Sequence, residues 1–154
     1  MLVFRLTRKK YMGQLSGVGA ALYPGRWNRK GQEVIYTAES RALALVEVLV
    51  HLAKDLVPSD YYLQTIEIPD DLPIGTITSN ALPPHWYDPM PANETRLIGA
   101  AILQNQCLMR VPSAIVQDEW NLLINPHQTG FERIVLLHEE PFSLDVRFFS
   151  PPGV

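Results

Sequence analysis

The stretch "ALYPGRWNRKGQEVIYTAES", residues 21–40, decides the fold of this chain and contains its least ordinary residues. It begins as a loop with two glycines, Gly25 and Gly31, continues as an apolar run and ends on a serine. Glycine permits tight turns, whereas alternating β-branched and aromatic residues favour a strand. We therefore expect a glycine-hinged loop, a short strand over residues 33–38, and a helix whose N-cap is Ser40.

The triplet in the middle of that loop, Arg26-Trp27-Asn28, contains more than a turn requires. A guanidinium between glycines can approach a phosphate or a carboxylate through two parallel hydrogen bonds, which predicts an anion site. The alternative is an arginine that pins the loop to Glu47 or to a backbone carbonyl. Trp27 is more typical of a loop anchor than of a stacking partner, and Asn28 is typical of turns because its side chain bonds nearby backbone groups.

The strand and the helix that follow each carry one candidate residue, Tyr36 and Glu47. Tyr36 alternates with Ile35, so the two side chains should lie on opposite faces, and the default for Tyr36 is a core residue with a bonded hydroxyl. The helix is expected over residues 41–55, where Glu47 is surrounded by apolar positions and His51 is its only polar neighbour one turn away. An unpaired buried carboxylate is unfavourable. Glu47 should therefore pair with a cation, face a cleft, or lie on a narrow solvent-facing stripe.

The remaining chain alternates short apolar runs with proline, aspartate and glycine, and one further stretch has the character of a helix. Strands are expected at residues 2–6, 61–68, 107–111, 113–116, 121–124, 132–137 and 145–149, an irregular passage at 69–92, and a helix from Asn93 to about Gln106. Because strands outnumber helices and do not alternate regularly with them, we predict an α+β fold. It should be a single compact mixed domain with central β-sheets and few flanking helices.

The composition argues against several classes of protein. A net charge of −3 disfavours a broad contact with nucleic-acid phosphates, because such domains are usually strongly basic. Cys107 is the only cysteine, so a disulfide framework and a thiolate metal cluster are excluded, as is typical of a reducing cytosol. No stretch is long and apolar enough to span a bilayer. We expect a cytoplasmic protein without a direct nucleic-acid or membrane partner.

The stretch "RVPSAIVQDEWNLLINPHQTG", residues 110–130, places a serine, carboxylates and a histidine close together. Ser113 lacks the G-x-S-x-G elbow of a serine hydrolase, which argues against a hydrolase triad. The four histidines of the chain show no metal-binding spacing, and no phosphate-binding loop of the form G-x-x-x-x-G-K-[ST] occurs. We therefore expect neither a metal site nor ordinary nucleoside-triphosphate chemistry.

Six segments carry a resemblance to a known family: "GRWNRKG", "VIYTAES", "ALALVEVLVHL", "VPSAIV", "EWNLLINP" and "DVRFF". In this order and spacing they resemble the RES-domain family, the toxin half of bacterial RES–Xre toxin–antitoxin pairs. The similarity covers nearly the whole chain and implies one RES domain over residues 1–154. It also implies a fold similar to the ADP-ribosyltransferase toxins and an enzyme that consumes NAD.

The resemblance assigns roles to particular residues. The arginine, glutamate and serine for which the family is named fall on Arg26, Glu47 and Ser113, with Tyr36 as a fourth pocket residue. Breaking the bond between nicotinamide and ribose develops positive charge on the sugar, which Glu47 would stabilise. Arg26 would hold the diphosphate of NAD and so fix the reacting ribose. Tyr36 would stack on or orient the nicotinamide, and Ser113 would bond the nicotinamide ribose or the carboxamide without acting as a nucleophile.

Three further residues, Trp27, Asn28 and Asn121, are expected to shape the loop and support the substrate pocket. The resemblance implies no prosthetic group, since NAD is the substrate. The implied function is depletion of cellular NAD, by hydrolysis or phosphorolysis, with arrest of growth. The alternatives are transfer of ADP-ribose to a protein and a non-enzymatic antitoxin-binding module. The implied partner is an Xre-type antitoxin that covers the active site, and exposed strand edges allow a homodimer within that complex.

Overall fold

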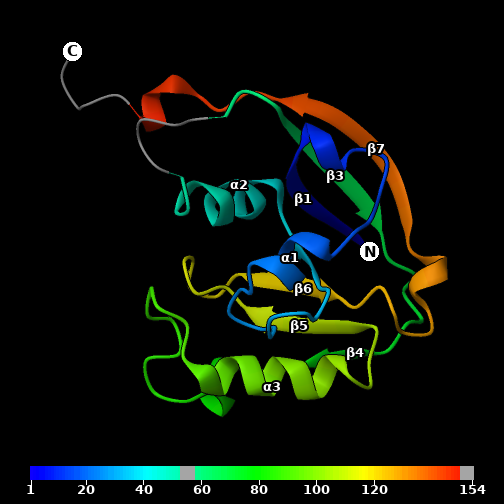
Figure 1. The fold of residues 1–154 in the computed structure, drawn as a ribbon, viewed down its shortest axis with the longest axis vertical. Helices are drawn as coiled ribbons and strands as arrows, with labels where there is room; N and C mark the ends of the chain where they lie inside the picture. Colours follow the sequence, from blue (N-terminus) through cyan, green and yellow to red (C-terminus); the bar gives the residue numbers. More distant parts are fainter. Residues whose placement is uncertain (53–57, 150–154) are drawn as a thin grey trace.

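The computed structural model describes residues 1–52 and 58–149, and in those ranges it contains one mixed sheet and three α-helices (Figure 1). The strands are β1 (Leu2–Arg8), β2 (Ile35–Ala38), β3 (Tyr61–Glu67), β4 (Ile74–Thr76), β5 (Leu108–Pro112), β6 (Trp120–Ile124) and β7 (Val135–Phe142). The helices are α1 (Val18–Leu22), α2 (Arg41–Leu49) and α3 (Asn93–Leu103). The predicted α+β class is confirmed.

The sheet opens near its centre. Its strand order is β4-β5-β6-β2-β1-β3-β7, and every pair is antiparallel except β4 with β5. β1 pairs with β3 along its whole length, whereas its register with β2 is a single pair, Phe4 opposite Ala38. Figure 1 shows the consequence: β1, β3 and β7 form one group of strands, and β6, β5 and β4 form another. We call the line between β1 and β2 the seam.

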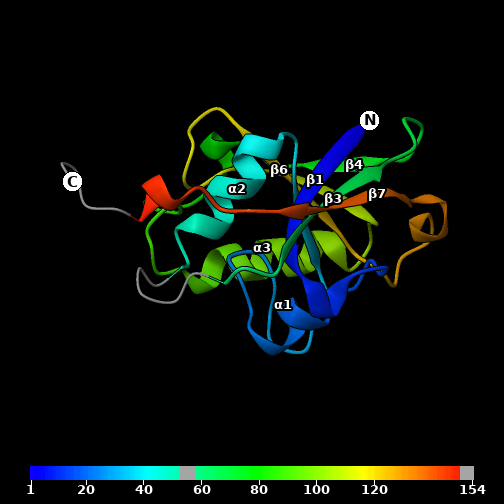
Figure 2. The ribbon, with the colours of Figure 1, turned by 90° about the horizontal axis from the view of Figure 1, so that it is seen from above.

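Helices cover each side of the seam. α2 packs its buried Leu43 and Ala44 near Phe4 and Ala38, the two residues that bridge the seam. α3 buries Leu103 in the cluster that covers β5 and β6. Seen from above in Figure 2, α1 and α2 are well separated, and the last described residues lie on the opposite side of the molecule from the N-terminus.

Two local expectations for the stretch that follows residue 31 are confirmed. Ile35 is fully buried in one core cluster, with Val3 among its members, whereas Tyr36 packs against a second cluster that contains Trp27. The two side chains thus lie on opposite faces of β2. The Ser40 hydroxyl accepts the N–H of Leu43 at 3.0 Å and so caps α2, as expected.

Two of the expected strands are wrong. Residues 113–116 form a turn, because the Ser113 hydroxyl accepts two backbone N–H groups that follow it and curls the chain. Residues 145–149 contain a 3₁₀ turn, Val146–Phe148, because the Asp145 carboxylate accepts a backbone N–H inside it. In both places a local polar side chain outweighs the β-propensity of the apolar residues.

Several boundaries also differ from expectation. The passage at 69–92 contains the short strand β4, and the glycine-rich segment before Tyr23 contains α1. α2 ends at Leu49, and the expected helical residues 53–55 lie outside the described residues. α3 starts at Asn93 with Ala92 as its N-cap, so Asn93 does not cap it, and it ends at Leu103 rather than near Gln106. No helix in the described ranges has the length and apolar character needed to cross a membrane.

Candidate functional site

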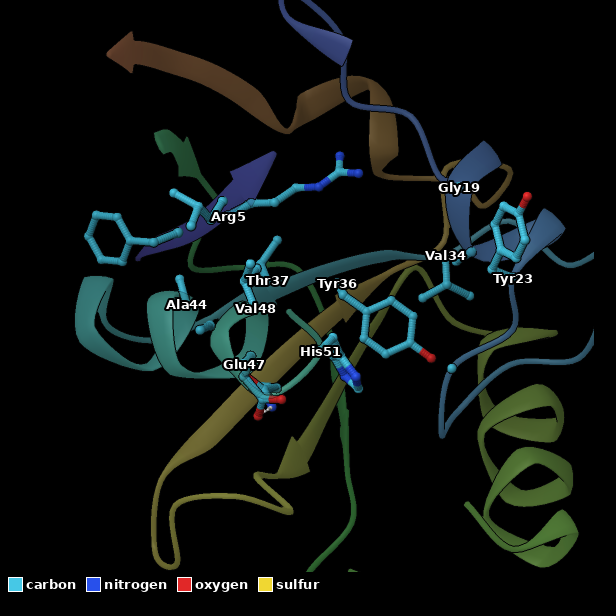
Figure 3. A pocket seen from close by; sticks show the side chains of 16 residues that line it. Arg5, Gly19, Tyr23, Val34, Tyr36, Thr37, Ala44, Glu47, Val48 and His51 are labelled. Atoms are coloured by element: carbon cyan, nitrogen blue, oxygen red, sulfur yellow. Dashed lines mark hydrogen bonds between the residues drawn. The ribbon is translucent and has the colours of Figure 1, made fainter. Parts of the chain in front are cut away.

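A cleft of about 340 Å³ lies at the seam (Figure 3). Side chains of β1, β2, α2 and β6 line it together with the segment around α1. Those that carry chemistry are Arg5, Tyr36, Glu47, His51 and Asn121. Two strands joined by one residue pair leave room between them, so the opening of the sheet itself produces the cleft.

Glu47 is held by two side chains from the other half of the sheet. Its Oε1 accepts hydrogen bonds from the Ser113 hydroxyl at 2.9 Å and from Asn121 Nδ2 at 2.5 Å. Asn121 lies on β6 opposite Ala38, which places its amide beside α2. No ion pair to Glu47 occurs among the described residues, so of the three expected environments the structure shows a carboxylate that faces a cleft.

The hydroxyl of Ser113 is fully used by the protein. It donates to Glu47 and accepts the N–H groups of Ile115 and Val116 at 3.1 and 3.0 Å, and the residue is buried. A hydroxyl has one proton and two lone pairs, and these three bonds occupy all of them. Ser113 therefore fixes the position of Glu47, whereas its predicted contact with substrate stays a prediction.

The loop over residues 25–28 forms a wall beside Tyr36. Asn28 is completely buried, and its Oδ1 accepts the Tyr36 hydroxyl at 2.8 Å and the N–H of Gly25 at 2.9 Å. The Tyr36 hydroxyl also accepts the N–H of Trp27 at 3.1 Å. A Cβ on Gly25 would lie 2.7 Å from that hydroxyl, so only glycine fits there. Burial raises the pKa of Tyr36 well above its usual value, so the ring presents a neutral phenol.

Arg26 makes backbone contacts in the structure. Its guanidinium donates to the carbonyl of Trp86 and, at 2.8 Å, to the carbonyl of Asp88. Burial lowers the pKa of Arg26, while the nearby charge of Glu47 opposes that effect. Arg26 therefore lies close to the cleft and pins the segment from 86 to 88, but its side chain is not among those that line the cleft. The diphosphate role of Arg26 stays a prediction.

Trp27 is an anchor of this wall. Its indole is buried and its ring centroid lies 6.1 Å from that of Trp86, at an interplanar angle of 40°. It belongs to the core cluster under α3 rather than to the cleft lining. Of the predicted site residues, the structure thus brings Tyr36, Glu47 and Asn121 into the cleft and places Trp27 and Asn28 behind it.

Arg5 is a cleft residue that the sequence patterns did not single out. It lies on β1, and its Nη1 is buried without a hydrogen-bond partner among the described residues. Burial lowers the pKa of Arg5 to about 10. Figure 3 places Arg5 and Glu47 at opposite ends of the cleft. The signal in the sequence was an arginine in the middle of an apolar strand. Alternation alone predicts that such a residue faces solvent, because the sequence does not show that the sheet opens at that point.

The described residues contain no group of three or more His, Cys, Asp or Glu side chains able to hold a metal ion. The cleft offers different chemistry: a carboxylate at one end, an unpaired cation at the other and a neutral aromatic ring between them. Such a cleft suits a ligand with an anionic part and a part that becomes cationic during a reaction.

The fold and the site together define an α+β domain whose mixed sheet opens over a cleft for a small molecule. Within that class, the chain belongs to the RES-domain family, because the model described as "RES domain" matches residues 2–145. The resemblance of the six sequence segments is thereby confirmed.

Similar proteins agree with this family. "Toxin Res" of Photorhabdus laumondii is 38% identical over 138 residues, which cover 88% of each chain. The "Prs ADP-ribosylating toxin" of Sphingobium sp. is 44% identical over 117 residues, covering 73% of this chain and 72% of that protein. In the M. tuberculosis MbcT–MbcA toxin–antitoxin complex, one chain matches with a TM-score of 0.74 and 23% identity, over 92% of this chain and 84% of that chain. The last similarity concerns the fold.

Proposed function

We propose that this protein is the toxin of a toxin–antitoxin pair and that it cleaves the bond between nicotinamide and ribose in NAD. The observation that carries the proposal is the Glu47 carboxylate, which Ser113 and Asn121 hold at one end of the cleft. The family membership and the names of the relatives support a toxin that uses NAD.

The chemistry needs a fixed negative charge at the reacting sugar. As the bond from ribose to nicotinamide breaks, its electron pair leaves with the nicotinamide nitrogen and the ribose acquires oxocarbenium character. A carboxylate already oriented by two hydrogen bonds stabilises that charge without having to reorganise. Glu47 is therefore the proposed catalytic residue, with Ser113 and Asn121 as positioning residues.

The other end of the cleft supplies one cation for the NAD diphosphate, Arg5. The Nη1 of Arg5, buried without a partner among the described residues, is available to an anion that enters the cleft, which favours binding of a phosphate there. Arg26, close enough to interact electrostatically with Glu47, is the second proposed diphosphate contact. Tyr36, fixed by Asn28, would orient the nicotinamide between them. The cleft volume of about 340 Å³ falls within the usual range for small-molecule sites.

The acceptor of the ADP-ribose group distinguishes two reactions. We favour degradation of free NAD, with water or phosphate as acceptor, because a cleft of about 340 Å³ holds the Glu47 carboxylate and Arg5 in one small-molecule site. The second candidate is transfer to a protein, favoured by the name of the Sphingobium relative. The proposed partner is an Xre-type antitoxin that covers the cleft, and the toxin–antitoxin complex found among similar folds supports a partner of this kind. We propose action in the cytoplasm, where NAD is available.

An NAD consumption assay on purified protein tests the proposal. The wild-type chain should release free nicotinamide, and Glu47→Gln should abolish that release while the protein stays folded. Glu67→Gln, a change at an exposed glutamate at the end of β3, is the matched control and should be fully active. Mass spectrometry of the products identifies ADP-ribose, its phosphate or a protein adduct. Full activity of Glu47→Gln would refute the mechanism.

A further inference from the structure

The proposed reaction needs a second group besides Glu47. When water or a hydroxyl captures the oxocarbenium-like ribose, the attacking oxygen must lose a proton. If Glu47 took that proton, it would lose the negative charge with which it stabilises the sugar, so one carboxylate serves both roles poorly. Glycosidases that face the same demand use two ionisable groups. Among residues 1–52 and 58–149, the cleft lining contains a single carboxylate, that of Glu47.

His51 is the other side chain in the lining with the required chemistry. It lies four residues beyond Glu47, just past the end of α2, and both residues line the cleft (Figure 3). Its backbone N–H bonds the carbonyl of Val48 at 3.0 Å, which fixes its place just after α2. Its imidazole has no hydrogen bond or ion pair among the described residues, and it is exposed at the cleft (Figure 3).

The other histidines differ from His51 in their partners and in their distance from the cleft. His85, His127 and His138 each lie within 4.0 Å of a carboxylate, and none of them lines the cleft. A free imidazole at a cleft mouth can accept a proton from an incoming group, because a neutral imidazole has one nitrogen with a free lone pair.

The remaining ionisable groups of the cleft are committed or unsuited. Tyr36, on β2, donates its hydroxyl proton to Asn28, and burial raises its pKa. Arg5, on β1, is a cation at neutral pH, since burial lowers its pKa only to about 10. Tyr23, after α1, is an exposed phenol. Glu47, on α2, holds its charge for the sugar.

We propose that His51 is the general base that activates the acceptor, an inference that rests on the proposed function. In this step the electron pair of the ribose–nicotinamide bond leaves with nicotinamide. An acceptor oxygen forms the new bond to the ribose carbon, and its proton passes to an unprotonated imidazole nitrogen of His51. The imidazole then returns the proton to solvent. The acceptor class is a neutral hydroxyl-bearing molecule, either water or an alcohol group.

A comparison of two acceptors tests this role. Phosphate dianion attacks through an oxygen that has no proton to lose, so its capture needs no base, whereas water does. His51→Gln should lower the rate of NAD hydrolysis by about a hundredfold or more, while formation of ADP-ribose phosphate stays close to the wild-type rate. His138→Gln, a change at an exposed histidine on β7, is the matched control and should leave both rates unchanged.

The pH dependence provides a readout that a structural role would not change. The wild-type hydrolysis rate should fall towards acid pH, because only an unprotonated base can take the proton of the acceptor, and the residual rate of His51→Gln should lack that limb. If the wild type uses an alcohol group instead of water, the pH dependence of that transfer is compared between the wild type and His51→Gln in the same way. Binding of NAD by a Glu47→Gln, His51→Gln double variant, measured by calorimetry, establishes that the cleft is intact. His51→Asn replaces His51→Gln if the latter does not fold.

Each outcome is decisive. Hydrolysis by His51→Gln equal to that of His138→Gln overturns the proposal, as does an equal loss with both acceptors or an unchanged acid limb. Release of nicotinamide by the wild type together with one of these results leaves the proposed function intact. Absence of NAD loss in the wild type with water, phosphate and lysate protein refutes the proposed function, and the role of His51 with it.

Discussion

Two hydrogen-bond donors, Ser113 and Asn121, hold the Glu47 carboxylate in place, and they differ in the other hydrogen bonds that they make. Asn121 gives one amide hydrogen bond to the carboxylate, whereas Ser113 both donates to it and accepts two backbone N–H groups of its own turn. Loss of either donor should leave the carboxylate free to turn, so the effect belongs to the chemical step rather than to substrate binding.

We expect Asn121→Ala to lower kcat for NAD cleavage by about ten- to a hundredfold with little change in KM. Ser113→Ala should lower kcat similarly, and it should also destabilise the fold by about 1 kcal/mol, because two partly buried N–H groups lose their acceptor. Steady-state kinetics and urea unfolding measure the two effects. Asn105→Ala, at an exposed position after α3, serves as control. A rise in KM alone would contradict a positioning role.

Replacing either of the two arginines near the cleft should change the free energy of unfolding, but in opposite directions. A buried cation without a partner is unfavourable in the free protein, so Arg5→Met should raise the free energy of unfolding by about 1–3 kcal/mol while weakening NAD binding. Arg26→Met removes bonds to two backbone carbonyls and should lower stability by about 1–3 kcal/mol. Thermal unfolding and calorimetry with NAD, both on a Glu47→Gln background, distinguish them. Destabilisation by Arg5→Met would show that its charge is paired in solution.

Much of the site could be anticipated from single residues, and the exceptions have a physical cause. Glu47 attracts attention in the sequence because it conflicts with its apolar context, and Asn28 is expected in a turn where its side chain bonds nearby backbone groups. Arg5 does not, because alternation in a strand predicts the face on which a side chain lies but not whether the sheet opens at that point. Arg26 donates to backbone carbonyls in the segment at 86–88. Because that segment is sixty residues away in the sequence, no local pattern predicts these contacts.

α3 and the wall loop approach each other so closely that glycine is required at their contact. A Cβ on Gly99 would lie 2.0 Å from the Trp27 carbonyl oxygen, which is far below a normal contact. Gly99→Ala should therefore destabilise the fold by about 1–3 kcal/mol, although alanine is the better helix former. Gly19→Ala, in α1 with no atom within 4 Å of the added methyl, should be neutral or slightly stabilising. Urea unfolding of both variants provides the test, and equal stabilities would contradict the contact.

Local rules predicted the elements that are long or strongly patterned and failed for those that depend on distant partners. β1, β2, β3 and α2 follow from alternation, helix propensity and the Ser40 cap. β4 has three residues and exists through its parallel pairing with β5, which no local pattern reveals. The turn at 113–116 contains apolar residues that favour a strand, yet the Ser113 hydroxyl determines its shape.

The molecule as a whole divides at the seam, and a ligand in the cleft should connect the two halves. Binding of NAD to the inactive Glu47→Gln variant should slow amide hydrogen exchange in β1, in β2 and at the end of α2. A second, shallower hollow near Arg29, Gln104 and His127 should be unaffected. Exchange measured by mass spectrometry with and without NAD is the test. Protection confined to that second hollow would place the ligand there and contradict the proposed site.

The long separation between Glu47 and the residues that hold it has a consequence for biosynthesis. Ser113 and Asn121 follow Glu47 by 66 and 74 positions, and β6, which carries Asn121, also pairs with β2. A ribosome delivers the chain from its N-terminal end, so a nascent polypeptide that has already exposed α2 still lacks both donors and a strand of the cleft wall. A translating chain is thus inert until β6 emerges. The proposed activity then appears late in synthesis, when most of the polypeptide is available for a neutralising partner to bind.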